Sequence, residues 1–250
     1  MTAKTALVCG GTSGLGSGIS QALRDRGARV VATSSRASDK TRIAHDIVHL
    51  DFGDKSSIGT CVSNLERAGL LPDILVVNGP GPAKGASATV SPQAWQEAFD
   101  LLWAGPLALV NHLLPTMLER RWGRVVWVTS VSCVRYVPNL AVSTSLRAGL
   151  HGLIKTLSAE YAGHGVTFNA IAPGYHATDR MRQLGVQQSI LDEIPVGRMG
   201  NPDEFGTSAA FLASEDAGYL TGQVLVCDGG WSHGKLPTPT ASTPEGIRVR

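Results

Sequence analysis

A glycine-rich segment close to the start of the chain has the composition and spacing of a phosphate-binding loop. It reads Gly10-Gly11-Thr12-Ser13-Gly14-Leu15-Gly16 and directly follows the apolar run Thr5–Cys9. Glycines adopt backbone angles closed to other residues and let the main chain approach a pyrophosphate. We predict a helix over Gly14–Arg26, whose free N–H groups and positive dipole end would point at that anion. The residues predicted to contact a dinucleotide here are Gly10, Thr12, Ser13, Gly14, Leu15 and Gly16.

The residues after the second predicted strand, Arg29–Thr33, bear on which dinucleotide is bound. An acidic residue at that point would hold the ribose hydroxyls and repel a 2′-phosphate. This chain has Ser34-Ser35-Arg36 instead, with no acid before Asp39. Because a guanidinium and serine hydroxyls suit a phosphate, we predict that Ser35 and Arg36 bind NADP(H) in preference to NAD(H). The alternative for Arg36 is a solvated surface charge.

These residues must be positioned by a sheet, and the chain alternates short apolar runs with longer helical patterns. The predicted strands are Thr5–Cys9, Arg29–Thr33, Ile47–Leu50, Ile74–Val77, Arg124–Thr129, Val166–Ile171 and Val224–Cys227. The predicted helices are Gly14–Arg26, Ser56–Ala68, Pro92–Glu119, Ser143–Tyr161 and Pro202–Ala213. The alternation predicts a single α/β domain over 1–231, a Rossmann-type doubly wound parallel sheet with helices on both faces. Residues 232–250 are rich in Pro, Thr and Ser, which predicts an extended or disordered tail.

Composition excludes several classes of function. The net charge is only +2 and no basic run exceeds two residues, which argues against a nucleic-acid partner. The apolar runs are of strand length, whereas a membrane span needs roughly 20 residues. None of the four cysteines forms a CxxC pair or lies near a His at metal spacing, so no metal site is expected. With no signal peptide predicted, this cysteine usage favours the cytoplasm.

Further motifs along the chain resemble those of one family. Asp73–Gly79 reads DILVVNG, and the segment from Asn169 reads NAIAPG, followed by Thr178. The glycine loop is similar to the TGxxxGxG signature of the short-chain dehydrogenase/reductase family, with Cys9 in place of Thr. The other two segments resemble the DILVNNA and NxxxPGxxxT signatures of that family, and the resemblance extends to about Trp231. Three further segments match the family's C-terminal pattern: Gly197–Gly200, Leu220–Gly222 and Asp228–Gly230.

The resemblance implies roles in binding the dinucleotide for residues outside the glycine loop. Asp51, with Phe52 beside it, matches the acid that the family places near the adenine. Further contacts are implied for Asn78, Gly79, Pro173, Gly174 and Thr178. The resemblance also implies a small-molecule substrate and a homodimer or homotetramer that pairs through the two longest predicted helices.

The resemblance also points to a set of catalytic positions. In this family reduction uses Asn, Ser, Tyr and Lys: Tyr is the general acid, Lys lowers its pKa and holds the ribose, Ser polarises the carbonyl, and Asn orders a water. Ser130 matches the Ser. The Tyr should follow thirteen residues later, where this chain has Ser143, and the Lys four further on, where it has Arg147. Leu102 stands at the Asn position. Ser130 and Ser143 would bind a substrate oxygen, and Arg147 the ribose or a phosphate.

Two branches of the family share part of this pattern. The segments Asn78–Pro82 and Asn139–Ala148 resemble a branch similar to 3-oxoacyl-carrier-protein reductases. The halohydrin dehalogenases use Ser, Tyr and Arg, but they lack the glycine loop that this chain keeps. The first branch therefore fits the chain better.

The substitutions change the chemistry that is available. A phenol has a pKa near 10 that a neighbouring cation can lower, whereas an aliphatic hydroxyl is a far weaker acid and arginine stays protonated. Tyr136, six residues after Ser130, lies in a loop that should border the substrate, although it could be an ordinary packed aromatic. Tyr175 and His176 directly follow Pro173 and Gly174, and an unperturbed His titrates near neutrality. Tyr136 and His176 are thus the candidate replacement acids.

Three hypotheses about function follow. The first is a divergent NADP(H)-dependent reductase that acts on a carbonyl and takes its proton from a relocated acid or from water. The second is a non-redox enzyme, such as a lyase, cyclase or isomerase, in which the dinucleotide is structural. The third is a nucleotide-binding protein without chemistry. In each, residues 175–195 are expected to form a lid over the site.

Overall fold

The computed structural model describes residues 4–36 and 43–234. Within them, seven parallel strands form one sheet in the order β3-β2-β1-β4-β5-β6-β7. The strands are β1 Thr5–Val8, β2 Arg29–Ser34, β3 Asp46–His49, β4 Ile74–Val77, β5 Gly123–Val128, β6 Val166–Pro173 and β7 Val224–Cys227. The strand order reverses between β1 and β4, and a crevice for ligands forms at such a switch point in open parallel sheets.

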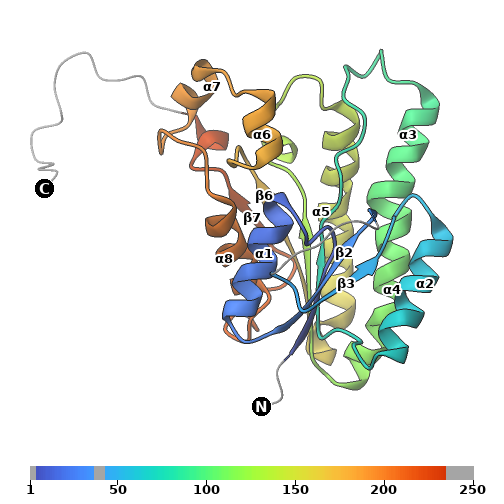
Figure 1. Cartoon of the computed structure of the whole chain (residues 1–250). Helices are drawn as coiled ribbons and strands as arrows, with labels where there is room; N and C mark the ends of the chain where they lie inside the picture. Colours follow the sequence, from blue (N-terminus) through green and yellow to red (C-terminus); the bar gives the residue numbers. More distant parts are fainter. Residues whose placement is uncertain (1–3, 37–42, 235–250) are drawn as a thin grey trace, which may run out of the picture.

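Helices cover both faces of the sheet (Figure 1). The first face carries α1 Gly14–Asp25 and α8 Pro202–Leu212, which pack against each other. The second carries α2 Lys55–Arg67, α4 Gly105–Glu119 and α5 Ala141–Tyr161. Two short helices, α6 Asp179–Leu184 and α7 Gln188–Glu193, lie beyond the carboxyl ends of the strands (Figure 1). The predicted Rossmann-type fold is therefore confirmed.

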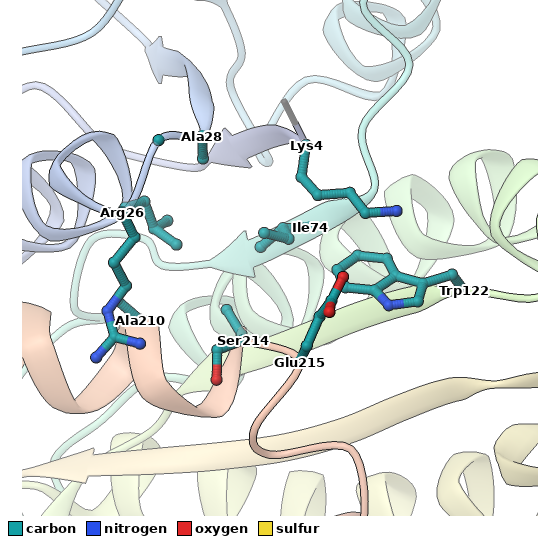
Figure 2. A pocket seen from close by; sticks show the side chains of 11 residues that line it. Lys4, Arg26, Ala28, Ile74, Trp122, Ala210, Ser214 and Glu215 are labelled. Carbon is teal, nitrogen blue, oxygen red and sulfur yellow. The ribbon is translucent and has the colours of Figure 1, made fainter. Parts of the chain in front are cut away.

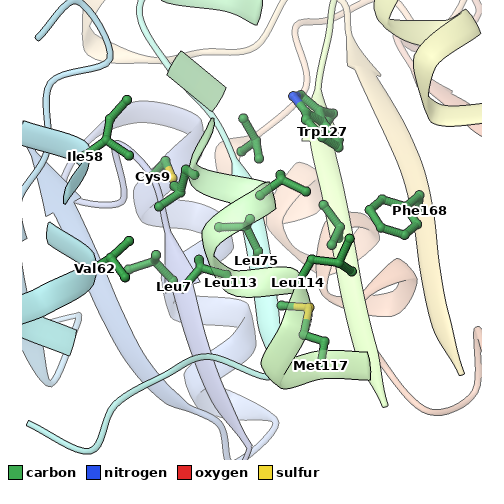
Figure 3. Packing of buried hydrophobic residues seen from close by; sticks show 14 of the residues in the cluster. Leu7, Cys9, Ile58, Val62, Leu75, Leu113, Leu114, Met117, Trp127 and Phe168 are labelled. Carbon is green, nitrogen blue, oxygen red and sulfur yellow. The ribbon is translucent and has the colours of Figure 1, made fainter. Parts of the chain in front are cut away.

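The strands are apolar throughout because each face of the sheet is covered. In β1, Ala6 and Val8 point into the cluster under α1 and α8, while Leu7 belongs to the cluster on the other face. Figure 3 shows this second cluster, where Leu113 and Met117 of α4 pack over the strands. The alternation fixes the register, since a slip by one residue would exchange the two faces.

The helix predicted over residues 92–119 is interrupted. It begins as α3 Pro92–Phe99, passes through a π-helical turn at Asp100–Ala104 and continues as α4. By length and apolar composition this whole segment could cross a membrane, contrary to the expectation that only strand-length apolar runs occur. Buried side chains such as Leu109 and Leu113, however, pack against the sheet, as in the core helix of a globular domain.

Most element boundaries lie within two residues of those predicted. The strands Ile74–Val77 and Val224–Cys227 match in full. The helices α6 and α7 fall in the segment expected to form a lid and were not predicted as helices. Of the predicted tail, residues 235–250 lie outside the described part of the chain.

Candidate functional site

A cleft of about 520 Å³ opens at the carboxyl ends of β1, β2 and β4, at the switch point of the sheet. Twelve residues predicted to bind a dinucleotide line it: Gly10, Thr12, Ser13, Gly14, Leu15, Ser35, Arg36, Asp51, Phe52, Asn78, Gly79 and Thr178. The cleft is within the size range of small-molecule sites. The predicted residues Gly16, Arg147, Pro173 and Gly174 do not line it.

The glycine loop needs its glycines for two separate reasons. Gly10 and Gly14 have φ angles of +58° and +55°, in the left-handed region that favours glycine. At Gly16 the limit is space, because an added Cβ would lie 2.0 Å from the carbonyl oxygen of Gly10. The Gly10 N–H donates to Thr33 Oγ1 at 3.2 Å. The loop is thus folded closely onto the start of α1, which presents its N-terminus to the cleft.

The loops after β3 and β4 form the facing wall. Asn78 Nδ2 donates to the Cys9 carbonyl at 3.2 Å, which ties the end of β4 to the glycine loop. Asp51 Oδ1 accepts from the Gly53 N–H at 2.9 Å, so this carboxylate also stabilises its own turn. The ring of Phe52 is buried below Gly79. These contacts build a wall whose position is set by the ends of the strands.

The far end of the cleft is formed by the residues that follow β2. Ser34 Oγ accepts from the Arg36 N–H at 3.0 Å, which turns the chain at this point. Ser35 and Arg36 line the cleft beside it. Arg36 is the only residue with a cationic side chain among the described residues that line the cleft.

The other end of the cleft is closed by the segment after β6. Thr178 caps α6, with Oγ1 accepting from the Met181 N–H at 3.3 Å, and its side chain lies against Gly14. Gly174 packs so tightly on Asp228 that an added Cβ would lie 2.6 Å from the Asp228 Cβ. Pro173 and Gly174 therefore support this segment from below the cleft.

The three residues at the predicted catalytic positions gather where β5 ends. Ser130 Oγ accepts from the Ser132 N–H at 3.1 Å. The helix α5, which carries Ser143 and Arg147, packs against the 3₁₀ turn Val131–Cys133 that follows Ser130. Ser143 is 7% exposed, and its hydroxyl has no hydrogen-bond partner among the described residues. These two hydroxyls thus lie on neighbouring elements.

Arg147 points inward rather than into the cleft at the switch point. Its Nη1 donates to the carbonyls of Val128, at 2.7 Å, and Thr129, at 3.3 Å, and the residue is only 8% exposed. Burial lowers the pKa of its guanidinium, although an arginine stays protonated in proteins. It faces a very small cavity that Leu102 and other apolar side chains share. Arg147 therefore holds the end of β5 in place.

The candidate replacement acids are not brought to the cleft. Tyr136 is 83% exposed, beyond the 3₁₀ turn. His176 is 4% exposed, with Nδ1 3.2 Å from the Gly174 carbonyl oxygen and Nε2 3.8 Å from Cys227 Sγ. Its ring packs edge-on against Phe205 of α8, beside a separate cavity of about 210 Å³. The contacts of His176 are those of a packing residue.

Burial lowers the pKa of His176, which gives a testable pH dependence of stability. The unfolded chain binds a proton at this histidine more readily than the folded chain does, so its contribution is intact above the ordinary pKa and is lost as pH falls. We expect His176→Gln to reduce the loss of unfolding free energy between pH 7 and pH 5, by at most about 1.4 kcal/mol per pH unit. Urea titrations measure this, with His164→Gln at an exposed site as control. Equal slopes for the two variants would contradict it.

A cluster of side chains ties α7 to the body of the protein. Arg135 forms a 2.5 Å ion pair with Glu193 of α7, and its guanidinium lies 4.1 Å from the ring centre of Trp231. The Trp231 Nε1 also donates to Glu193, at 3.2 Å. Tyr175 packs edge-on against the same indole, with 4.9 Å between ring centres. The segment after β6 is thus fixed beside the 3₁₀ turn that follows Ser130.

Some lining residues were missed by sequence reasoning. They are Thr33, Ser34, Leu50, Pro80, Leu101 and Asp179. Ser34 ends β2 and Leu50 directly follows β3, while Thr33 and Pro80 lie within three residues of a strand end, so a rule that counts every residue near the carboxyl end of a strand would have found these four. Leu101 reaches the cleft from the unpredicted π-helical turn, and Asp179 begins the unpredicted helix α6. In the described chain no group of three His, Cys, Asp or Glu side chains could hold a metal ion.

Comparison with known proteins places this fold and cleft in one family. Residues 10–232 match the family model described as enoyl-(acyl carrier protein) reductase. The chain is 34% identical over 246 residues to nodulation protein G of Azospirillum brasilense, covering 93% of this chain and 100% of the relative. It is 33% identical over 242 residues to a 3-oxoacyl-(acyl-carrier-protein) reductase of Haemophilus influenzae, covering 92% and 98%.

A solved structure agrees with these sequence relatives. The crystal structure of an NADPH-dependent reductase involved in bacilysin biosynthesis superposes with a TM-score of 0.87 at 25% identity, covering 92% of this chain and 98% of the other. The family model, the relatives and the shared fold agree over almost the whole chain. The chain therefore belongs to the short-chain dehydrogenase/reductase family of oxidoreductases.

Proposed function

We propose that this protein is an NADP(H)-dependent oxidoreductase that reduces a carbonyl of a small molecule or acyl intermediate without the family's usual Tyr and Lys. The observation that carries the proposal is the cleft itself, which joins an intact glycine loop to a positively charged end at Arg36. Relatives named as reductases of 3-oxoacyl groups and of acetoacetyl-CoA support the class of substrate.

The chain's own geometry fits a dinucleotide. Because Gly16 has no side chain, the glycine loop can pack directly on the first turn of α1. The main-chain N–H groups of that turn can then face an anion in the cleft. The loop from Gly10 to Leu15 would hold the pyrophosphate, and Ser35 and Arg36 the 2′-phosphate. Asp51 and Phe52 would border the adenine, with Asn78 and Gly79 next to the adjoining ribose. Thr178 would lie near the nicotinamide, with Pro173 and Gly174 supporting it.

Ser130, Ser143 and Arg147 would act mainly by binding the substrate oxygen and by stabilising negative charge on it. When bound, a reduced nicotinamide supplies a hydride to the substrate carbon. Ser130 and Ser143 would hydrogen-bond to the substrate oxygen, and the buried cation of Arg147 would favour negative charge on that oxygen. No side chain in this group is a ready proton donor near neutrality, so water would provide the proton. Absence of a general acid typically costs 10²- to 10⁴-fold in rate, and we expect a slow reductase.

The test combines binding with turnover. Purified protein is titrated with NADPH by calorimetry and then mixed with acetoacetyl-CoA and other carbonyl compounds while the absorbance of reduced nicotinamide is followed. Substrate-dependent loss of absorbance supports the proposal. Tight NADPH binding without turnover on any carbonyl would contradict it and favour a non-redox enzyme, in which product forms with no net change in the dinucleotide.

The selectivity for NADP(H) can be tested separately at Arg36. We expect Arg36→Gln to weaken NADPH binding by about 10- to 100-fold, the range for loss of a charge-assisted hydrogen bond, and to leave NADH binding unchanged. Calorimetric titrations with both dinucleotides measure this. Arg67→Gln, which removes an exposed cation from α2, is the matched control. If both dinucleotides lose affinity equally, Arg36 does not read the 2′-phosphate.

We also propose that the protein forms a homodimer or homotetramer through the helices around α4 and α5. On the segment before α4, Phe99 is exposed and stacks on Trp103, whose Nε1 donates to the Leu146 carbonyl of α5 at 2.7 Å. These contacts give the two helices one continuous, partly apolar face. Sedimentation velocity should give a dimer or tetramer, and Phe99→Arg should shift it towards the monomer, whereas a monomeric unmodified protein would contradict the proposal.

A further inference from the structure

A second cavity lies at the opposite end of the sheet from the dinucleotide cleft. It has a volume of about 460 Å³ and lies between the C-terminal ends of α1 and α8 and the start of β4 (Figure 2). We call it the basal pocket, and its main lining side chains are Lys4, Leu23, Arg26, Ile74, Trp122 and Ala210. Its volume is within the range of small-molecule sites. In the parallel sheet, this pocket lies where strands begin and the cleft lies where strands end. The described linings of the two have no residue in common.

The floor of the basal pocket is apolar and fixed. Leu23, Ile74 and Ala210 are almost fully buried and belong to the cluster that α1 and α8 form with the sheet. The ring of Trp122 also contacts Arg124, whose guanidinium carbon lies 4.5 Å from the ring centre. Arg124 Nε in turn donates to the Ser214 carbonyl at 2.9 Å. These contacts support both the floor and the Trp122 wall of the pocket.

The mouth of the basal pocket carries an excess of positive charge. Lys4 Nζ lies 4.0 Å from the ring centre of Trp122, and Arg26 stands on the opposite side of the opening (Figure 2). In the described part of the chain, neither side chain has a carboxylate within ion-pair distance. Among the described lining residues, Glu215 is the one acid, against these two cations. An apolar floor below two unneutralised cations is complementary to a molecule with an apolar body and one negative charge.

We propose that the basal pocket binds an amphipathic monocarboxylate, with an alkyl chain or one aromatic ring as its apolar body. The carboxylate would lie between Lys4 and Arg26, where it can accept charge-assisted hydrogen bonds from both. The apolar body would pack on Leu23, Ile74 and Ala210, on the side of Trp122 that faces the opening. This site is separate from the proposed reductase chemistry and does not depend on it.

The proposal is tested with octanoate as the probe. The full chain is labelled with fluorotryptophan, and Trp122→Phe identifies the Trp122 signal among the five tryptophans in fluorine NMR. We expect octanoate to shift the Trp122 signal saturably. Octylamine, with the same chain but the opposite charge, should bind at least tenfold more weakly. No saturable shift at Trp122, or equal affinity for the two probes, would overturn the proposal.

Variants test the role of the cations. The double variant Lys4→Met/Arg26→Met keeps apolar side chains of similar length and should weaken octanoate binding by about tenfold or more. Arg67→Met removes a cation from the last turn of α2 instead and should leave the affinity unchanged. An unchanged affinity in the double variant, with circular dichroism showing a folded protein, would also overturn the proposal. The comparison of octanoate with octylamine on the unmodified chain tests it even if this variant does not fold.

Discussion

Gly16→Ala is expected to abolish measurable NADPH binding and to lower the free energy of unfolding by about 1–3 kcal/mol or more. The added Cβ would lie 2.0 Å from the Gly10 carbonyl oxygen and 3.0 Å from Asn78 Nδ2. The first of these atoms belongs to the backbone of the glycine loop, so the clash cannot be relieved by a side-chain rotation. The loop must move away from α1, and with it the N–H groups that face the cleft.

The higher helix propensity of alanine is too small to compensate for this clash. Alanine stabilises a helix by about 1 kcal/mol relative to glycine, and Gly16 is within the first turn of α1. Gly59→Ala isolates this gain, because Gly59 lies within α2 and an added Cβ there meets no atom within 4 Å. We expect Gly59→Ala to raise stability by about 0.5–1 kcal/mol with unchanged NADPH affinity. Urea denaturation and calorimetry measure both variants, and a Gly16→Ala protein that binds NADPH normally would refute the assigned role of the loop.

The fold was largely predictable because its signal is local and repeated. Runs such as Ile74–Val77 are apolar on both faces, which is typical of a strand covered by two layers of helices. The π-helical turn at Asp100–Ala104 was not predictable in this way. It inserts one residue into a continuous apolar pattern, so Leu101 turns towards the cleft while Leu102 is buried. The helices α6 and α7 have six residues each, too few to display a period.

The candidate site was predictable where the backbone defines it. The glycine loop, with Gly10, follows from its place between the first strand and the first helix, and the family resemblance implied Asp51 and Asn78; all three line the cleft. Side-chain direction depends on packing between distant elements and could not be predicted. Arg147 donates to the carbonyls at the end of β5, and His176 packs against α8, although both were expected to face bound molecules.

The double variant Ser143→Tyr/Arg147→Lys is expected to raise kcat/KM for NADPH-dependent carbonyl reduction by at least about 100-fold, the low end of the range for general acid catalysis. A phenol in the first turn of α5 would lie close to Ser130, and a lysine one turn later would lower the phenol's pKa. Lysine can also replace one of the hydrogen bonds that Arg147 makes to Val128 and Thr129. Leu102 still lacks an amide to order a water, so the gain should not reach the upper end of the range.

The control for this variant is Ser143→Phe/Arg147→Lys, which has the same ring and the same cation but no hydroxyl. If the phenol is the acid, only the tyrosine variant gains activity, and its rate falls as pH rises through the pKa of the phenol, because the acid must be protonated to act. Steady-state rates across pH, with NADPH affinity and thermal unfolding measured on both proteins, separate this from a change of shape. Equal rates in the two folded variants would mean that the pocket cannot use an acid at this position. If both variants still bind NADPH, the missing gain in activity does not arise from the dinucleotide site. A non-redox reaction would then better explain why Ser143 and Arg147 lie close to Ser130.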